Sequence, residues 1–220
     1  MVDIYVKRVD ELWYGFAFTG EKILATAICS TKEESVKTLV SNIPLNLDHR
    51  VIEEPSEFAE KIIMMLKKLS DGDEEGKSFS LATECMPKPN AKVLAAAAAI
   101  PIGYVTSYGN IAKTADTDAQ TVGKIMATNP LYPIVPCHRV VGADFSLVGY
   151  GGGKRPSALR AKLARLRAEE RHFASDMELF VNGRKLTVYP VERVTRRAEK
   201  HDLNSSQQGK LLDYIESGNQ

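Results

Sequence analysis

The stretch that decides how this chain is interpreted is Pro133-Ile134-Val135-Pro136-Cys137-His138-Arg139-Val140. It sets one thiol between a proline and a histidine inside an apolar run that we expect to be strand-like. Pro136 fixes its own φ and restricts the residue before it, and the imidazole of His138 can change its charge near neutral pH. A cysteine buried only for packing needs neither neighbour. We therefore interpret Cys137 as a thiol held for chemistry.

The bulk composition indicates an intracellular protein. With 220 residues, 44% of them hydrophobic, the chain can form one large or two small domains. Three cysteines (Cys29, Cys85 and Cys137) are too few for a secreted disulfide scaffold, and no apolar N-terminal segment resembles a signal peptide or a membrane span. No Cys-x-x-Cys or His-x-x-x-His spacing is present, so we expect no protein-built metal site. We expect a cytoplasmic location; whether Cys29 and Cys85 approach one another is left open.

Charge is distributed unevenly along the chain. Residues 1–86 carry 10 Lys and Arg against 16 Asp and Glu, a net charge of −6, whereas residues 87–175 carry 12 against 5, a net charge of +7. The second region is the one that can attract a polyanion. A basic face that only contacts solvent is the alternative, and charge alone does not exclude it.

Residues 1–86 are predicted to form a small domain of strands and helices. The apolar segments 4–9, 12–18 and 23–29 are separated by short turns, which predicts an antiparallel meander. Thr31 to Glu34 matches a capping box that opens a helix, and residues 56–68 have apolar side chains at helical spacing.

Pro87-Lys88-Pro89 is the best candidate for a domain boundary, because two prolines in three residues disfavour both helix and sheet. Asn90 can then cap a helix that runs through the alanine tract at residues 95–99. Two short helices follow at residues 110–115 and 119–128, separated by a tight polar turn. This order is typical of a helix-turn-helix, although any helical hairpin has similar spacing.

The segments after the cysteine are a glycine-rich loop, a basic helix and a hairpin. Four glycines surround Tyr150 between residues 149 and 153, so backbone can approach a ligand closely there; a plain flexible connector is the alternative. Residues 154–171 predict a basic helix, and Asn182-Gly183 predicts a hairpin turn. The polar end, residues 200–220, contains one short helical pattern near residues 211–215 and is assigned no function.

Taken together, Pro136-Cys137-His138-Arg139-Val140, Tyr108, Asn129-Pro130 and Gly149-Tyr150-Gly151-Gly152 resemble the O6-alkylguanine-DNA alkyltransferases, also called methylated-DNA–protein-cysteine methyltransferases. The resemblance is close over residues 87–173. It implies an α+β or α/β protein in which a ribonuclease-H-like domain (residues 1–86) precedes a winged helix-turn-helix domain that binds DNA and accepts the alkyl group (residues 87–175). Residues 176–220 would be a C-terminal extension of unknown role.

The resemblance implies that Cys137 attacks the alkyl carbon on O6 of guanine, which gives S-alkylcysteine and restored guanine. A free thiol has a pKa of about 8.5, so a base is needed at neutral pH. His138 is the candidate base, acting through a water. A carboxylate should orient its imidazole; Glu169 matches best and Glu170 is the alternative. Tyr150 matches the tyrosine that donates a proton toward O6. No cofactor is implied, and each molecule should act once.

The resemblance also implies double-stranded DNA as the partner of a monomer, with the damaged nucleotide rotated out of the helix. Tyr108 matches the tyrosine that drives this rotation, and Asn129 joins the recognition helix to the active-site turn. The residues expected to contact DNA are Tyr108, Gln120, Thr121, Asn129, Arg139, Gly151 and Gly152. Those expected to line the guanine pocket are Pro136, Val140 and Gly149.

Two residues depart from the family's pattern. Gln120 stands where an arginine usually fills the gap left by the rotated nucleotide; glutamine carries no charge and stacks less well. Gly151 stands where many relatives have a serine that helps to bind O6. We expect weaker DNA binding or slower rotation, and unchanged chemistry at the sulfur.

Two other classes of protein fit parts of the pattern. A non-reactive sensor of alkylated DNA would share the scaffold, but such relatives have lost the cysteine that this chain keeps. A cysteine hydrolase unrelated to DNA would need Cys137 and His138 without the helix pair and the basic stretch. The sequence leaves open which alkyl groups fit and whether O4-alkylthymine is accepted.

Overall fold

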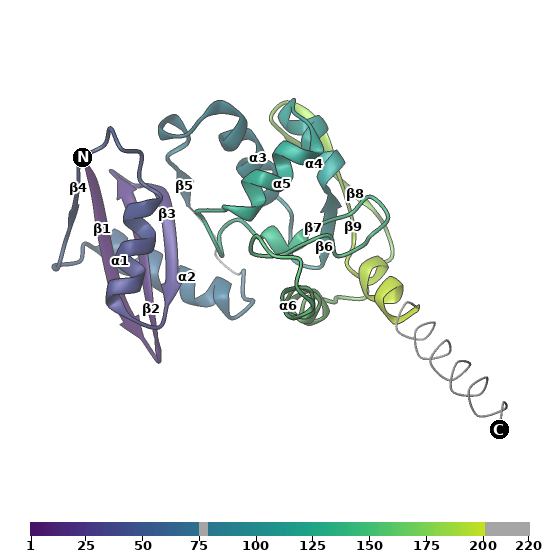
Figure 1. Cartoon of the computed structure of the whole chain (residues 1–220), viewed down its shortest axis with the longest axis horizontal. Coiled ribbons are helices and arrows are strands. Elements are labelled where there is room, and N and C mark those ends of the chain that lie inside the picture. The colour runs from purple at the N-terminus through teal and green to yellow at the C-terminus, as the bar shows by residue number, and fades with distance from the viewer. Residues whose placement is uncertain (75–78, 201–220) are drawn as a thin grey trace, which may run out of the picture.

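The computed structural model describes residues 1–74 and 79–200. In this range the chain forms two parts that lie side by side, one built on the sheet that contains the N-terminus and one that is mainly helical (Figure 1). One cluster of buried apolar side chains joins them, since it includes Phe16 of the first part with Leu94 and Ile134 of the second. The fold is mixed α+β, as the sequence predicted.

The first sheet has five strands in the order β4-β1-β2-β3-β5. Its three central strands are consecutive and antiparallel, which confirms the predicted meander. Each short outer strand lies parallel to its neighbour. The strands are β1 (Val2–Val9), β2 (Leu12–Thr19), β3 (Lys22–Cys29), β4 (His49–Val51) and β5 (Ser80–Leu81).

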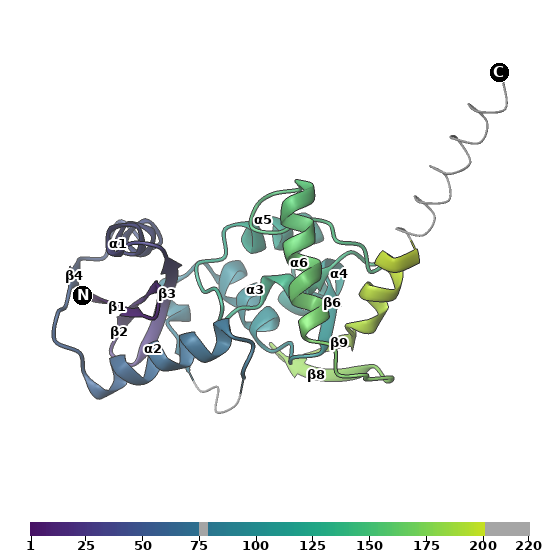
Figure 2. The ribbon, with the colours of Figure 1, turned by 90° about the horizontal axis from the view of Figure 1, so that it is seen from below.

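Two helices cover opposite faces of this sheet, α1 (Lys32–Ser41) and α2 (Glu57–Ser70) (Figure 2). Both begin at residues that cap their N-termini: the Thr31 hydroxyl accepts a hydrogen bond from the Glu34 amide, and Ser56 does the same for Ala59. The sheet can bury both faces because alternate strand residues pack under different helices.

The second part combines helices with a four-stranded sheet in the order β7-β6-β9-β8. Strand β6 lies at its centre, parallel to β7 and antiparallel to β9. The hairpin predicted at Asn182-Gly183 forms β8 and β9. The elements are η1 (Thr83–Cys85), α3 (Lys88–Ala98), β6 (Tyr104–Ser107), α4 (Tyr108–Ala115), α5 (Ala119–Ala127), η2 (Cys137–Arg139), β7 (Val140–Val141), α6 (Pro156–Ala168), β8 (Met177–Val181) and β9 (Arg184–Pro190).

The predicted helix pair is present as α4 and α5, each within two residues of its expected bounds. The turn between them is polar because it must reverse the chain in three residues. Asp116 adopts φ 61°, in the left-handed region that aspartate tolerates better than most residues. Asp118 then caps α5 by accepting a hydrogen bond from the Thr121 amide at 2.9 Å.

Three predictions about local structure were wrong. Asn90 does not cap α3, because the helix already begins at Lys88, directly after Pro87. Pro89 is tolerated in the first turn, where its missing N–H has no intrahelical partner. Cys137 lies in the 3-10 helix η2 and not in a strand. The basic helix is shorter than residues 154–171, as α6 ends at Ala168. The helical pattern near residues 211–215 lies outside the described residues.

Candidate active site

Cys137 is held at the start of η2 by the end of α5. The side chain of Asn129, just beyond α5, donates a hydrogen bond to the Val135 carbonyl at 2.8 Å and accepts one from the Leu131 amide at 3.0 Å. Ile134 and Val135 are fully buried. The turn that carries the cysteine is therefore fixed to the helix pair by one amide side chain and to the core by apolar packing.

The thiol of Cys137 is partly buried and carries no disulfide. Burial raises its pKa, while the side chain of Asn129 and the charges of Lys162 and Arg165 act in the opposite direction. The net shift is upward, so the thiol is protonated at neutral pH. A group that accepts its proton is needed before the sulfur can act as a nucleophile.

His138 and Glu169 form a buried pair, with 2.6 Å between imidazole Nε2 and carboxylate Oε1. Burial by itself raises the pKa of Glu169, but the hydrogen bonds from His138 and Arg139 outweigh it and lower that pKa to about 2. Burial lowers the pKa of His138 despite its carboxylate partner. A neutral imidazole beside an ionised carboxylate donates from Nε2, which leaves Nδ1 as the nitrogen that can take a proton.

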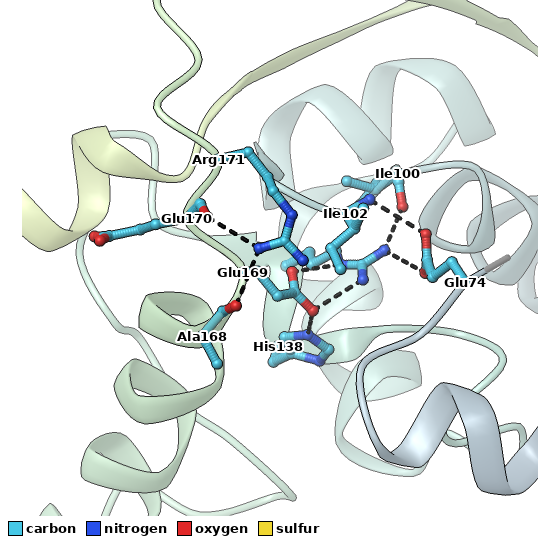
Figure 3. Close-up of polar contacts among 9 residues, drawn as sticks. Glu74, Ile100, Ile102, His138, Ala168, Glu169, Glu170 and Arg171 are labelled. Atoms are coloured by element: carbon cyan, nitrogen blue, oxygen red, sulfur yellow. Dashed lines mark hydrogen bonds and ion pairs between the residues drawn. The ribbon is translucent and has the colours of Figure 1, made fainter.

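Figure 3 distinguishes the two candidate carboxylates. Glu169 points at His138, whereas the side chain of Glu170 points away from it. The Nδ1 atom of His138 is buried and has no hydrogen-bond partner in the described part of the chain. Within those residues no direct hydrogen bond joins the Cys137 sulfur to the imidazole.

Arg139 does not lie where the sequence placed it. We expected it to contact DNA, but its side chain is 3% exposed and its guanidinium binds Glu169 through Nε at 2.7 Å and Nη2 at 2.8 Å. Its Nη1 also donates to Glu74 of the first part and to the Ile100 carbonyl, both at 2.8 Å. The DNA-contact prediction for Arg139 was therefore wrong, because residues distant in sequence surround its charge.

Lys162 is a site residue that sequence reasoning missed. It is fully buried, and its ammonium donates to the carbonyls of Val140 at 2.6 Å and Gly149 at 3.0 Å. Burial lowers its pKa to about 8. A signal was present, because Lys162 falls between Leu159 and Leu166 at helical spacing, on the apolar stripe of α6.

A cavity of about 580 Å³ lies between α5 and the glycine-rich loop, and Cys137 forms part of its wall. The hydroxyls of Tyr108 and Tyr150 stay protonated at neutral pH, because burial raises the pKa of each. Gly151 and Gly152 adopt φ 54° and 74°, which lets the loop turn back over the cavity. The predicted site residues that line it are Tyr108, Gln120, Cys137, Gly149, Tyr150, Gly151 and Gly152.

The predicted site residues that do not line this cavity are Thr121, Asn129, Pro136, His138, Arg139, Val140 and Glu169. Pro136 and Val140 are buried and do not reach it, so their expected contact with guanine has no geometric support. Thr121 is half-buried on α5, and both its amide and its hydroxyl donate to Asp118. A second cavity of about 270 Å³ adjoins Cys137 and is lined by Met126, Ala127, Asn129, Tyr132, Tyr150, Gly151 and Arg165.

Comparisons with known proteins agree with this geometry. Residues 88–171 match the family model for the DNA-binding domain of 6-O-methylguanine DNA methyltransferase. A methylated-DNA–protein-cysteine methyltransferase of Methanocaldococcus jannaschii is 31% identical over 150 residues, which is 66% of this chain and 84% of that protein. One from Pyrobaculum aerophilum is 57% identical over 54 residues, 24% of this chain and 36% of that protein.

Solved structures extend the similarity to most of the fold. The crystal structure of Mycobacterium tuberculosis OGT in complex with DNA has a TM-score of 0.53 and 24% sequence identity, covering 76% of this chain and 92% of that one. At this identity the likeness concerns the fold. The assignment itself rests on the Methanocaldococcus relative, which this chain matches over most of its length, and on the family model that spans the cavity. The chain therefore belongs to the methylated-DNA–protein-cysteine methyltransferase family.

Proposed function

We propose that this protein repairs DNA by moving an alkyl group from O6 of guanine to the sulfur of Cys137. The observation that carries the proposal is the cavity that exposes Cys137 between Tyr108 and Tyr150, with the His138–Glu169 pair beside it. The family relatives carry the name of this activity. The reaction class is nucleophilic displacement at carbon, with one thiol as the acceptor.

Proton transfer from the thiol is the first step that the site must perform. Because burial keeps Cys137 protonated, we assign His138 Nδ1, which has no other hydrogen-bond partner in the described residues, as the proton acceptor, with a bridging water as the expected route. The resulting imidazolium is stabilised by Glu169, whose ionised oxygen already accepts the hydrogen bond from Nε2. Arg139 is a positioning residue, since it fixes both oxygens of Glu169.

Departure of guanine is the second requirement. As the carbon–oxygen bond breaks, negative charge develops on O6 and the base must gain a proton. The hydroxyl of Tyr150 lines the cavity and stays protonated, so it is the donor that we assign to this step. The product thioether has no good leaving group. Each molecule is therefore consumed in one reaction.

The substrate in this proposal is double-stranded DNA that contains O6-alkylguanine. A base inside the duplex cannot reach a partly buried sulfur, so the nucleotide rotates into the cavity. Tyr108, the first residue of α4, and Gln120, near the start of α5, both line the cavity and are assigned to rotation and to filling the gap. Gly151 and Gly152 let the opposite wall approach the base closely.

The fold proposal follows from the same elements. We assign α4, α5 and the β8–β9 hairpin to a winged helix-turn-helix, and the first sheet with its two helices to a ribonuclease-H-like domain. The proposed division remains near residue 87. Because β9 pairs with β6, we extend the second domain past residue 175 to include the hairpin.

We also propose that the protein acts as a monomer in the cytoplasm, with access to chromosomal DNA. The proposed catalytic residues Cys137, His138, Tyr150 and Glu169 come together within one chain, and its three cysteines are free thiols, as in a reducing compartment. In the described range, no helix combines the length and apolarity that a bilayer crossing requires.

Reaction with O6-benzylguanine tests the central proposal. Intact-mass measurement should show one added benzyl group per molecule even with excess reagent, and peptide mapping should place it on Cys137. The Cys137→Ala variant should gain nothing, while Cys85→Ala should react like wild type. An unmodified wild-type protein favours the sensor, and repeated turnover favours a hydrolase; either result contradicts the proposal.

A further inference from the structure

The second cavity beside Cys137 contains a positive charge that the reaction described above does not use. Arg165 of α6 lines this cavity of about 270 Å³ together with Cys137, Tyr132 and Tyr150. Its neighbours Arg160 and Arg167 on the same helix are exposed, whereas Arg165 is partly buried. Of these three arginines, Arg165 is the one that shares a cavity wall with the reactive sulfur.

The charge of Arg165 is not neutralised by a nearby carboxylate. Its guanidinium lies 5.2 Å from the ring centroid of Tyr132, and within residues 1–74 and 79–200 it makes no ion pair or hydrogen bond. Glu169 is the acidic group of this region, and its oxygens are bound by His138 and Arg139. The ammonium of Lys162 is also occupied, by two carbonyl groups.

Tyr132 lines the same cavity, with its ring beside Arg165. Its hydroxyl oxygen is buried and has no hydrogen-bond partner in the described chain. Because no water-sized atom can reach that oxygen, Tyr132 contributes its ring, and not its hydroxyl, to the cavity surface. Burial raises the pKa of this phenol, so the hydroxyl keeps its proton at neutral pH.

These observations describe a small space next to the alkyl-accepting sulfur, lined by one cation that no carboxylate of the described residues pairs with. We propose that Arg165 forms an anion-binding end of the alkyl subsite, which favours guanines that carry a short carboxylated group, such as O6-carboxymethylguanine. This inference rests on the proposed function and adds a specificity-determining role for Arg165.

Electrostatics explains why the charge matters for such a substrate. A carboxylate brought next to a thiolate repels it, and removal from water costs further free energy unless a cation is close. Arg165 offsets both effects, and its planar guanidinium can donate two parallel hydrogen bonds to a carboxylate. A methyl group carries no charge and gains nothing from the guanidinium.

The transfer follows the same course as for a methyl group. The Cys137 sulfur forms a bond to the methylene carbon while the bond from that carbon to O6 breaks. The electron pair leaves with guanine, and the proton first lost by the thiol is balanced by the proton that guanine gains. The products are S-carboxymethylcysteine and guanine, and no other reactant is needed.

The test compares two substrates of the same shape that differ in charge. Single-turnover rates are measured on one duplex carrying O6-carboxymethylguanine or its neutral amide, O6-carbamoylmethylguanine. The wild-type ratio of the acid rate to the amide rate should fall about 10- to 100-fold in Arg165→Met, as expected for loss of a charge-assisted hydrogen bond. Arg165→Lys should retain part of the preference.

The matched control is Arg167→Met, which removes the same charge from an exposed position of α6. Its ratio should equal that of wild type. An unchanged ratio in Arg165→Met, or an equal fall in Arg167→Met, overturns the inference. Using a ratio removes general effects on folding and DNA binding. Methyl transfer by wild type, measured on the same duplex, separates failure of this inference from failure of the proposed function.

Discussion

At the scale of single residues, Glu169 is the carboxylate that binds both the candidate base and a buried cation of the site. It lies directly after α6, yet it is buried and bound by groups from residues 138 and 139. Its oxygens hold an imidazole and a guanidinium, so it orients the base and compensates a buried charge with one group. The neighbouring Glu170 has the same chemistry and contacts neither.

The pH dependence of stability should show the contribution of Glu169. Its pKa is lowered from 4.5 to about 2 in the folded chain, so its contribution is present above pH 4.5 and is lost as the pH falls toward 2. We expect a loss of about 3 kcal/mol in the free energy of unfolding over this window. Urea unfolding at several pH values measures it.

Glu169→Gln should lower the stability at pH 7 and flatten its dependence on acid, because the amide cannot ionise. Glu170→Gln is the matched control and should behave like wild type. Equal pH profiles for wild type and Glu169→Gln would show that the carboxylate makes no such contribution.

Gln120 is the second residue at this scale, and its substitution should change the affinity for DNA. It is exposed and lines the rim of the first cavity at the start of α5. Gln120→Arg should tighten binding to duplex DNA about tenfold, because it adds a charge-assisted contact. Fluorescence anisotropy at fixed salt measures this. Gln120→Leu, which adds no charge, should not tighten binding, and Cys137 should remain the acceptor in both. Unchanged or weaker binding by Gln120→Arg would refute the assignment.

At the scale of elements, α6 holds the glycine-rich loop in place. Lys162 donates to Gly149 at one end of the loop and to Val140 at the start of β7, so one side chain joins three elements. Within the loop, Tyr150 and Gly153 exchange two backbone hydrogen bonds of 2.9 Å. The position of the Tyr150 hydroxyl therefore depends on a buried lysine from another element.

Lys162→Met should loosen this loop. The substitution keeps an unbranched side chain that ends one atom short of the ammonium, and it leaves two carbonyl groups without their donor. Amide exchange at residues 149–153 should therefore become about tenfold faster or more. Hydrogen–deuterium exchange measured by mass spectrometry reports it. Arg160→Met, at an exposed position of the same helix, should leave the loop unchanged. Equal exchange in both variants would mean that the loop is held by its own hydrogen bonds.

At the scale of the whole molecule, the first part of the chain supports the reactive turn of the second. Thr26 of β3 donates from its hydroxyl to the Tyr132 carbonyl at 2.6 Å and from its amide to the Pro130 carbonyl at 2.8 Å. Glu74 reaches Arg139 from the same part. The segment that leads to Cys137 is thus fixed from both sides, although residues 1–86 lie outside the matched DNA-binding region.

Local chemistry in the sequence accounts for what could be predicted. The meander, the Thr31 cap, the α4–α5 pair and the hairpin at Asn182-Gly183 each depend on a few adjacent residues, so their patterns predicted them. The prediction at Asn90 failed because a proline can also mark the start of a helix, and Pro87 lies three residues before Asn90. The strand expected around Cys137 failed because Pro133 and Pro136, which both precede it, favour a tight turn over an extended run.

The sequence by itself determined the chemistry: a thiol beside an imidazole, a tyrosine within a glycine-rich loop and a helix pair. Only the tertiary structure decided which partners these groups meet. Arg139 binds Glu169 and Glu74, Lys162 is buried, and Arg165 lines a cavity, although all three belong to the basic region at residues 87–175. The physical reason is that a charged side chain takes its role from the burial and counter-charges around it, and these come from residues far away in the chain.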